Sequence, residues 1–297
     1  MSVNPDVDAS DETPYLFSSK RSRLLVGRRG VVASTLSSLV IVGVIVAVLF
    51  VAPGGASFRY YFFNPHYLWV SWVGDPKLGI EAIRSGLLTN IWMFLVSEVL
   101  VLFIGLALAW TRMSHSPVLL PFRILVTGYT DVFRGIPLLL VVFIVGYGLP
   151  ALQLGFVSSL SLATYGVIAL TLTYSAYVAE VFRAGILSVP NGQLLAARSL
   201  GLTHASTMRR VTLPQAVRTV VPPLLNDFIS LQKDTALVST LGAVEATRAA
   251  QIFASTDFNG SGLVVASLFF LALTIPMTRF TDRLMARDRA RRLAVAS

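Results

Sequence analysis

The sequence predicts an all-α protein that crosses a membrane several times. Of its 297 residues, 55% are hydrophobic and only 13% are charged, and the mean hydropathy is +0.72. Apolar runs long enough to span a bilayer alternate with shorter polar stretches along most of the chain. Arginine gathers in the polar stretches that fall on one side of that alternation. We therefore expect a polytopic membrane protein with about six transmembrane helices.

The first part of the chain is expected to stand apart from the rest. Residues 1–30 are polar, acidic at first and then basic, which is typical of a disordered cytoplasmic tail. Residues 31–84 are expected to hold an extra N-terminal transmembrane helix, at 31–52, followed by an extracytoplasmic segment. The helix exceeds the length of a signal-peptide hydrophobic region, so we interpret it as a retained anchor. Clustered tyrosine, tryptophan and phenylalanine after it favour the membrane interface over a ligand-stacking site.

Residues 85–281 are expected to form the main transmembrane domain, and residues 282–297 a basic cytoplasmic tail. Further spans are predicted at 86–110, 119–149, 155–181, 217–238 and 263–277. Arg134, Gly135 and Pro137 interrupt the second of these runs. It is therefore either one kinked span or two segments.

Arginine asymmetry sets the expected orientation. With about six spans, the basic N-terminal cluster, Arg112, residues 190–214 and the C-terminal tail share one side. The other side receives only Arg59, Lys77, Arg84 and Arg248. The richer side is cytoplasmic by the positive-inside rule, so both termini and residues 190–214 are expected there. The +9 formal charge thus indicates membrane orientation and not nucleic-acid binding.

The stretch 190–214 is the most polar interruption between two apolar tracts. Good helix formers up to Leu200, a glycine at 201 and Thr203 predict a helix, a left-handed glycine turn and a second, capped helix. Pro214 can then begin the next span. Leu194, Ala197 and Leu200 at helical spacing predict a small apolar face that another surface can approach. The alternative is an ordinary loop lying on lipid headgroups.

Ionisable residues recur inside the predicted spans, where they are costly and mark pathways or pairs. Opposite charges on neighbouring helices can simply neutralise each other. They can also line a cavity for a zwitterionic substrate, whose carboxylate and ammonium need partners of both signs. The candidate residues for a substrate path or gate are Arg134, Glu180, Asn226, Lys233 and Asp234.

Nothing in the sequence indicates that the chain itself catalyses a reaction. The chain has no cysteine and three well-separated histidines, so we expect no metal site and no nucleophilic thiol. No phosphate-binding glycine loop is present, so no cofactor is expected and any ATP hydrolysis must come from a partner. We expect a transport protein without catalytic residues.

Several ordered motifs resemble a known family. They are R-G-I-P-L-L-L (134–140), A-Y-V-A-E-V-F-R-A-G-I-L-S-V-P-N-G-Q (176–193), L-P-Q-A-V-R (213–218), P-P-L-L-N (222–226) and K-D-T-A-L (233–237). Ala196-Ala197, three residues, Gly201, nine residues and Val211-x-Leu213-Pro214 resemble the coupling loop of ABC importer permeases. Together the motifs look like the permease subunits of polar amino-acid ABC importers. Leu195 and Ala236 depart from the family's usual glutamate and serine.

The resemblance implies a type I ABC importer permease fold, a five-helix core to which this chain adds an N-terminal helix. It also implies a second permease subunit, identical or not, two ATPase subunits that use ATP and magnesium, and an extracytoplasmic binding protein that delivers a polar amino acid. The membrane would be the inner or plasma membrane of a prokaryote. The residues it assigns to ATPase coupling are Gln193, Leu195, Ala196, Ala197, Gly201, Leu213 and Pro214.

Two other classes of membrane protein are compatible with the same composition. An ion-gradient-driven secondary transporter or channel would use Glu98, Asp131 or Glu180 as its ion site, and an inverted repeat would favour it, but none is visible. An intramembrane protease would need a nucleophile elbow or paired histidines, which the sequence lacks.

Overall fold

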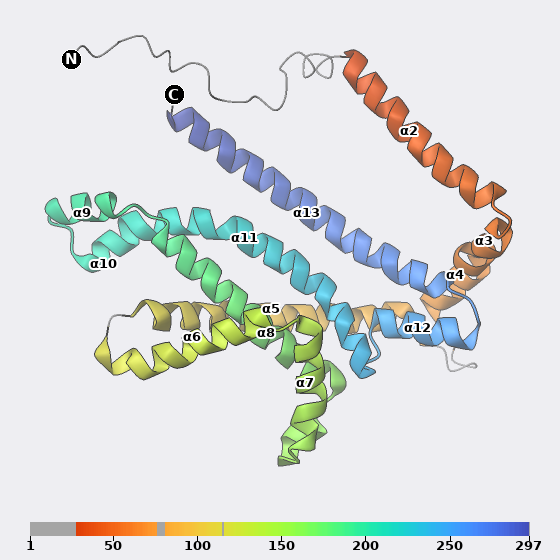
Figure 1. Ribbon diagram of the computed structural model, residues 1–297, viewed down its shortest axis with the longest axis horizontal. Coiled ribbons are helices and arrows are strands. Elements are labelled where there is room, and N and C mark those ends of the chain that lie inside the picture. Colours follow the sequence, from red (N-terminus) through yellow and green to blue (C-terminus); the bar gives the residue numbers. More distant parts are fainter. Residues whose placement is uncertain (1–27, 76–80, 115, 297) are drawn as a thin grey trace, which may run out of the picture. The chain divides into compact units, whose positions relative to one another are not determined.

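The computed structural model describes residues 28–75, 81–114 and 116–296. The chain divides into two compact units, Met1–Tyr60 and Tyr61–Ser297 (Figure 1). The predicted tail at 1–30 lies almost wholly outside the described residues. In the first unit, helix α2 (Arg28–Val51) is the predicted anchor, and none of its spanning window is buried. Arg59 of α3 (Gly55–Phe63) ties the two helices together by donating to the carbonyl oxygen of Leu49 at 2.6 Å.

The spans of the second unit largely follow the expectation. Helices α5 (Ile83–Met113), α8 (Leu162–Leu187) and α13 (Ser261–Ala296) are long and apolar enough to cross a membrane, as is α2. A bent pair, α6 (Leu120–Gly135) and α7 (Leu138–Ala151), brings the total in the described ranges to five. The remaining expected span, 217–238, corresponds to α11 (Leu213–Asp234), which has 22 residues but does not reach the same apolar composition.

The break between α6 and α7 resolves the question left open at 119–149. The structure has two helices, bent by 110°. Ile136 is extended, with φ −92° and ψ 132°, because the ring of Pro137 disfavours helical backbone in the residue before it. The α6 end is stabilised from α8, where the Tyr177 hydroxyl donates to the Arg134 carbonyl at 3.2 Å.

Helix α8 is the centre of the second unit. It packs against α5, α6, α7 and α11, and 67% of its spanning window is buried, against 28% for α5 and 17% for α13. Small residues allow this packing. A side chain at Gly105 of α5 would lie 2.8 Å from Val178, and one at Gly185 of α8 would overlap Val220.

A buried polar network joins α5 to the segment after α11. Glu245 is 0% exposed and caps α12 (Ala246–Thr256) by accepting from the backbone N–H groups of Thr247 and Arg248. The Asn90 amide donates to Glu245 at 2.8 Å and to Thr235 at 3.0 Å. Burial raises the pKa of Glu245, and these hydrogen bonds oppose that rise. With its hydrogen bonds made inside the fold, Glu245 fixes the position of α12.

The remaining elements complete the chain. Helix α4 (Pro65–Val73) packs on α5 and α13. The expected domain boundary between residues 84 and 85 stays a prediction. Helix α13 continues into the expected basic tail. Short 3₁₀ turns η1 (Pro117–Leu119), η2 (Gly155–Ser159) and η4 (Thr235–Leu241) connect the longer helices. His66 lies in α4 and His204 in a short helix.

Candidate functional site

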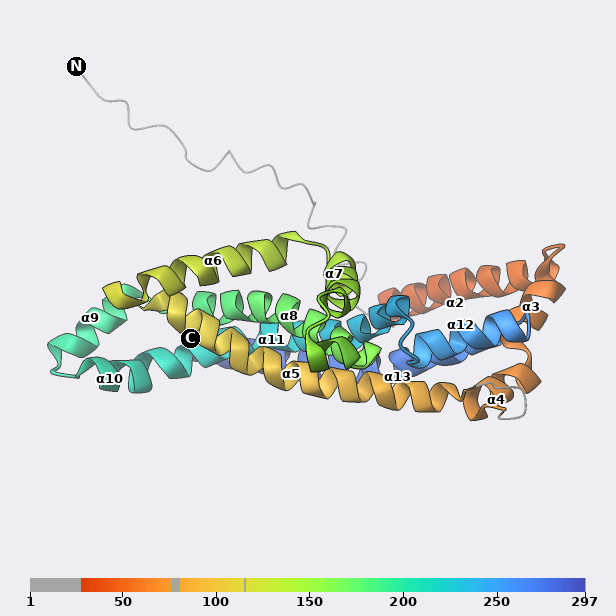
Figure 2. The same cartoon turned by 90° about the horizontal axis from the view of Figure 1, so that it is seen from below.

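The stretch 190–214 folds as predicted into a helical hairpin. It comprises α9 (Asn191–Ser199), α10 (His204–Thr207) and a π-helical turn, η3 (Met208–Thr212), that leads into α11. Gly201 has φ +81°. The N–H of Leu202 bonds to the carbonyl of Ala197, and that of Gly201 to Arg198, which together make a Schellman motif. Figures 1 and 2 place this hairpin at one end of the second unit, away from α4 and α12.

The hairpin is held by side chains as well as by its backbone. Thr203 caps α10 by accepting from the N–H of Ser206. The Gln215 amide donates to Gln193 at 2.6 Å, which joins α9 to the first turn of α11. Leu213 and Pro214 are exposed at the start of α11.

The exposed apolar face of α9 differs from the predicted one. Leu200 is 84% exposed and Leu195 66%, and Ala196 is exposed beside them. Ala197 is only 6% exposed and Leu194 is half-buried. The expectation that Ala197 faces outward was wrong: Ala197 is buried, and α10 and η3 pack against α9. The available surface is therefore Leu195, Ala196 and Leu200.

The structure brings two of the predicted path residues to one face of α8. Arg134, exposed at the end of α6, lies with its guanidinium carbon 5.8 Å from the centre of the Tyr177 ring. The Tyr174 ring lies 6.4 Å from that of Tyr177, and its hydroxyl donates to Asp234 at 2.7 Å. We name Arg134, Tyr177, Tyr174 and Asp234 the α8 row. A cation stands at one end of it and a carboxylate at the other.

The other predicted path residues are less closely joined to the row. Lys233 is exposed next to Asp234. Asn226 is exposed on α11 about two helical turns before Asp234. Neither tyrosine was predicted as a site residue. Their spacing of three, which places them on one helix face, was the available signal.

Glu180 is engaged elsewhere. It accepts from Arg112 of α5 at 2.8 Å and pairs with Arg183, one turn further along α8. Arg112 also donates to Thr130 of α6 at 3.1 Å. Glu180 therefore links α5 to α8, and no ion pair joins it to Arg134 in the described residues. The sequence assigned Arg112 only to membrane orientation.

A second acidic feature lies between α5 and α11. Glu98 of α5 and Asp227 of α11 are each half-buried. One carboxylate oxygen of Asp227 is buried and has no hydrogen-bond partner. The aromatic rings of Phe94 and Phe228, from the same two helices, pack with their centres 4.6 Å apart. Across the residues that the structure describes, no group of three or more histidine, aspartate or glutamate side chains is arranged to hold a metal ion.

Comparison with known proteins defines the class. Residues 102–289 match the family described as binding-protein-dependent transport system inner membrane component. The chain belongs to this family, whose members are transport subunits and not enzymes. It is therefore an inner membrane protein and a permease of the ABC transporter type, and membership implies an ATPase partner and a second permease.

Individual relatives agree with this. A probable glutamine ABC transporter permease of Bacillus subtilis is 37% identical over 59% of this chain and 78% of its own. An arginine transport system permease of the same organism is 35% identical over 67% of this chain and 89% of its own. An L-cystine transport system permease, also from Bacillus subtilis, is 40% identical over 57% of this chain and 69% of its own.

Solved structures place the fold among type I ABC importer permeases. A crystal structure of an amino acid ABC transporter with histidines has a chain that is 33% identical, with a TM-score of 0.63, over 69% of this chain and 93% of the other. An inward-facing MetNI methionine ABC transporter matches with a TM-score of 0.56 at 19% identity and supports the fold alone. The predicted fold class is confirmed.

Proposed function

We propose that this chain is the permease subunit of an ATP-driven importer of polar amino acids. Two permease subunits would form the path, two ATPase subunits would supply the energy, and an extracytoplasmic protein would deliver the substrate. The observation that carries the proposal is the hairpin at 190–214, because its exposed apolar face and its exposed arginines, Arg198, Arg209 and Arg210, suit a protein surface. The named relatives that carry glutamine, arginine and cystine support the substrate class.

In this proposal, the hairpin transmits ATPase movement to the membrane helices. The α9 face made by Leu195, Ala196 and Leu200 docks on the ATPase, and Gly201 fixes the angle between α9 and α10. The bond between Gln193 and Gln215 carries the displacement into α11. A ligand can bias a two-state protein only through contacts that differ between the states, and this hairpin would supply them.

The α8 row is the proposed contact for the amino-acid backbone. The guanidinium of Arg134 suits a carboxylate, and Asp234 suits an ammonium group. The tyrosines between them offer ring faces and hydroxyls, so the row can accompany a zwitterion along α8. Lys233 and Asn226 would line the approach. Glu180 would hold α5 against α8 and not touch substrate.

Transport by the reconstituted complex tests the proposal. In proteoliposomes, uptake of labelled amino acids should require ATP and the binding protein, and should be unaffected when proton and sodium gradients are collapsed. Uptake that is driven by such a gradient without ATP would instead establish the secondary transporter.

A variant in the α8 row tests the path. Asp234→Asn should lower uptake by about tenfold, because it removes a charge-assisted contact, while ATP hydrolysis is still stimulated by the loaded binding protein. The matched control is Asp282→Asn, an exposed carboxylate on α13 outside the row. Equal uptake by the two variants would remove Asp234 from the path.

A further inference from the structure

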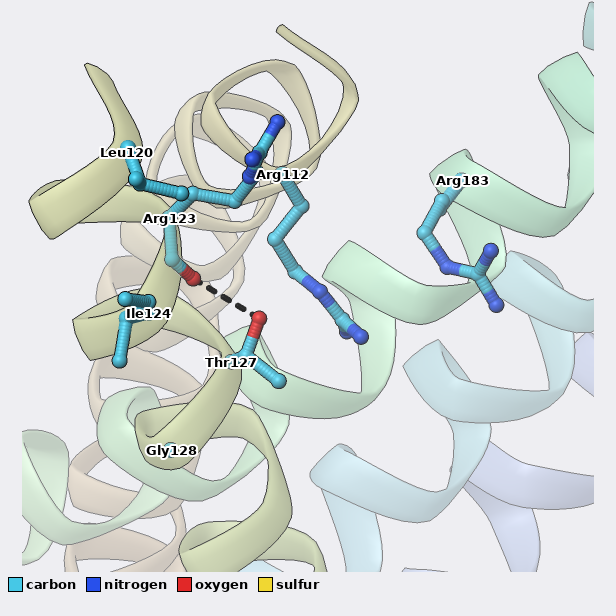
Figure 3. Close-up of a pocket in the computed structure, with 7 residues that line it drawn as sticks. All are labelled: Arg112, Leu120, Arg123, Ile124, Thr127, Gly128 and Arg183. Atoms are coloured by element: carbon cyan, nitrogen blue, oxygen red, sulfur yellow. Dashed lines mark hydrogen bonds between the residues drawn. The ribbon is translucent and has the colours of Figure 1, made fainter. Parts of the chain in front are cut away.

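Three arginines from three helices line a cavity at the same end of the second unit as the hairpin. The cavity has a volume of about 600 Å³ and is lined by Arg112, Leu120, Arg123, Ile124, Thr127, Gly128 and Arg183. Figure 3 shows Arg123 on the same helix as Leu120, Ile124 and Thr127, with Arg112 of α5 beside it and Arg183 of α8 farther off, its guanidinium turned away from Arg123. The transport proposal does not use this cavity.

The cavity carries more positive charge than its own residues neutralise. Glu180 is the carboxylate that pairs with Arg112 and with Arg183. Arg123 donates to a neutral partner, the carbonyl oxygen of Ser114, at 2.9 Å. No other carboxylate lies within ion-pair distance of these arginines in the described ranges. The residues that line the cavity and Glu180 together therefore carry an excess of two positive charges, and an anion with two charges or several acceptor oxygens would balance it.

Apolar surface continues from the arginines along α6. Leu120 and Ile124 line the cavity itself. On the same helix, Phe122, Ile124 and Leu125 are exposed, the last two by 63% and 69%. Arg112 and Arg183 lie near the last turns of their spans, and Arg123 lies near the first turn of α6. Arginines at span ends sit at the depth of lipid headgroups, with apolar surface at the depth of the acyl chains.

We propose that this cavity binds the phosphate headgroup of an anionic membrane lipid, with Arg123 as the main contact and an acyl chain along Leu120 and Ile124. Basic pockets between helix ends are suited to such headgroups. Inorganic phosphate would satisfy the arginines but leave the apolar surface uncovered. A second copy of the chain meeting this surface across a two-fold axis would set arginine against arginine.

Lipid binding to the purified complex tests the proposal. Native mass spectrometry would compare phosphatidylglycerol with phosphatidylcholine, and thermal unfolding would compare both with inorganic phosphate. We expect phosphatidylglycerol to bind and to raise the unfolding temperature, and the other two to have little effect. Equal stabilisation by inorganic phosphate would replace the lipid site with a simple anion site, and equal binding of the two lipids would overturn the proposal.

Two variants separate this site from general attraction to an anionic surface. Arg123→Gln should weaken phosphatidylglycerol binding about 5-fold, which corresponds to the loss of one arginine near the headgroups. Gly128→Leu should weaken it by filling the cavity, and it should fold, because a Cβ at Gly128 meets nothing within 4 Å. Unfolding without lipid checks the folding of each variant.

The matched control is Arg279→Gln, an exposed arginine of α13 near the same end of its span that does not line the cavity. It should bind phosphatidylglycerol like the parent chain. If all three variants lose binding equally, or if none does, the cavity is not the site. Because the readout is lipid binding and not uptake, failure here leaves the transport proposal standing.

Discussion

The hairpin at 190–214 and the α8 row are specified by different kinds of information. In the hairpin, the geometry follows from neighbours in the sequence, since Gly201, Thr203 and Pro214 form the turn, the cap and the helix start. In the row, Asp234 meets Tyr174 across 60 residues of chain. The hairpin can therefore be redesigned locally, whereas the row depends on how α8 packs.

The sharpest contrast is between a glycine of the hairpin and a glycine of α8, the helix on whose packing the row depends. Gly185→Val on α8 should prevent stable folding or lower stability by about 1–3 kcal/mol, because its side chain would overlap Val220. Gly192→Ala on α9 meets nothing within 4 Å and should leave stability unchanged or slightly higher. Thermal unfolding of both variants checks this. Equal losses at the two positions would contradict the difference between the regions.

Within the hairpin, the effect of replacing Gly201 should depend on whether the new residue tolerates left-handed backbone, more than on the size of its side chain. Gly201→Val should uncouple ATP hydrolysis from uptake, because a β-branched residue at φ +81° costs about 1–3 kcal/mol of local strain. Gly201→Asn is the matched control, since asparagine tolerates left-handed backbone, and it should keep most of the coupling. ATP hydrolysis and uptake would be measured on the same complex. Normal coupling in the valine variant would show that the turn is not needed.

Beside the row, Glu180 should behave as one member of a coupled group. Glu180→Gln leaves Arg112 and Arg183 without their anion. It should cost about 1–2 kcal/mol, less than the cost of breaking a fully buried pair, because these side chains are partly exposed. The double variant Arg112→Gln, Glu180→Gln should cost less than the sum of the single changes. Additive losses in the unfolding free energy would show that the pair does not join α5 to α8.

These differences explain what the sequence could predict. The fold class follows from hydropathy, and the hairpin follows from local turn and cap chemistry, so both were accessible. The outward face of α9 could not be predicted, because the burial of Ala197 depends on tertiary packing, in which α10 and η3 contact α9. Only one of the two partners of Glu180 could be predicted from the sequence. Arg183 is one turn away on the same helix, but Arg112 lies 68 residues before Glu180, on another helix.

The bent pair α6–α7 shows the same limit on what the sequence can predict. Pro137 made an interruption predictable, yet the choice between a kink and two helices depends on how the freed end of α6 is stabilised. That stabilisation comes from Tyr177 on α8, which contacts the Arg134 carbonyl. Packing on α8 therefore decides the geometry that places Arg134 in the row.

Orientation is tested by substitutions with little expected effect on stability. The chain has no cysteine, so single cysteines are unique labels. Thr203→Cys in the hairpin should react with a membrane-impermeant reagent only from the cytoplasmic side, and Ser57→Cys only from outside. Labelling of both from the same side would overturn the proposed topology.

Cross-linking of the hairpin to the ATPase most directly tests whether the exposed face of α9 is the docking surface. Leu200→Cys, at a position that is 84% exposed, is compared with Ala197→Cys, at one that is 6% exposed. In the assembled complex, a short cysteine-to-lysine reagent should join the Leu200 variant to the ATPase subunit and leave the Ala197 variant uncoupled to it. Cross-linking from Ala197 and not from Leu200, or from neither in a complex that transports, would contradict the proposed docking surface.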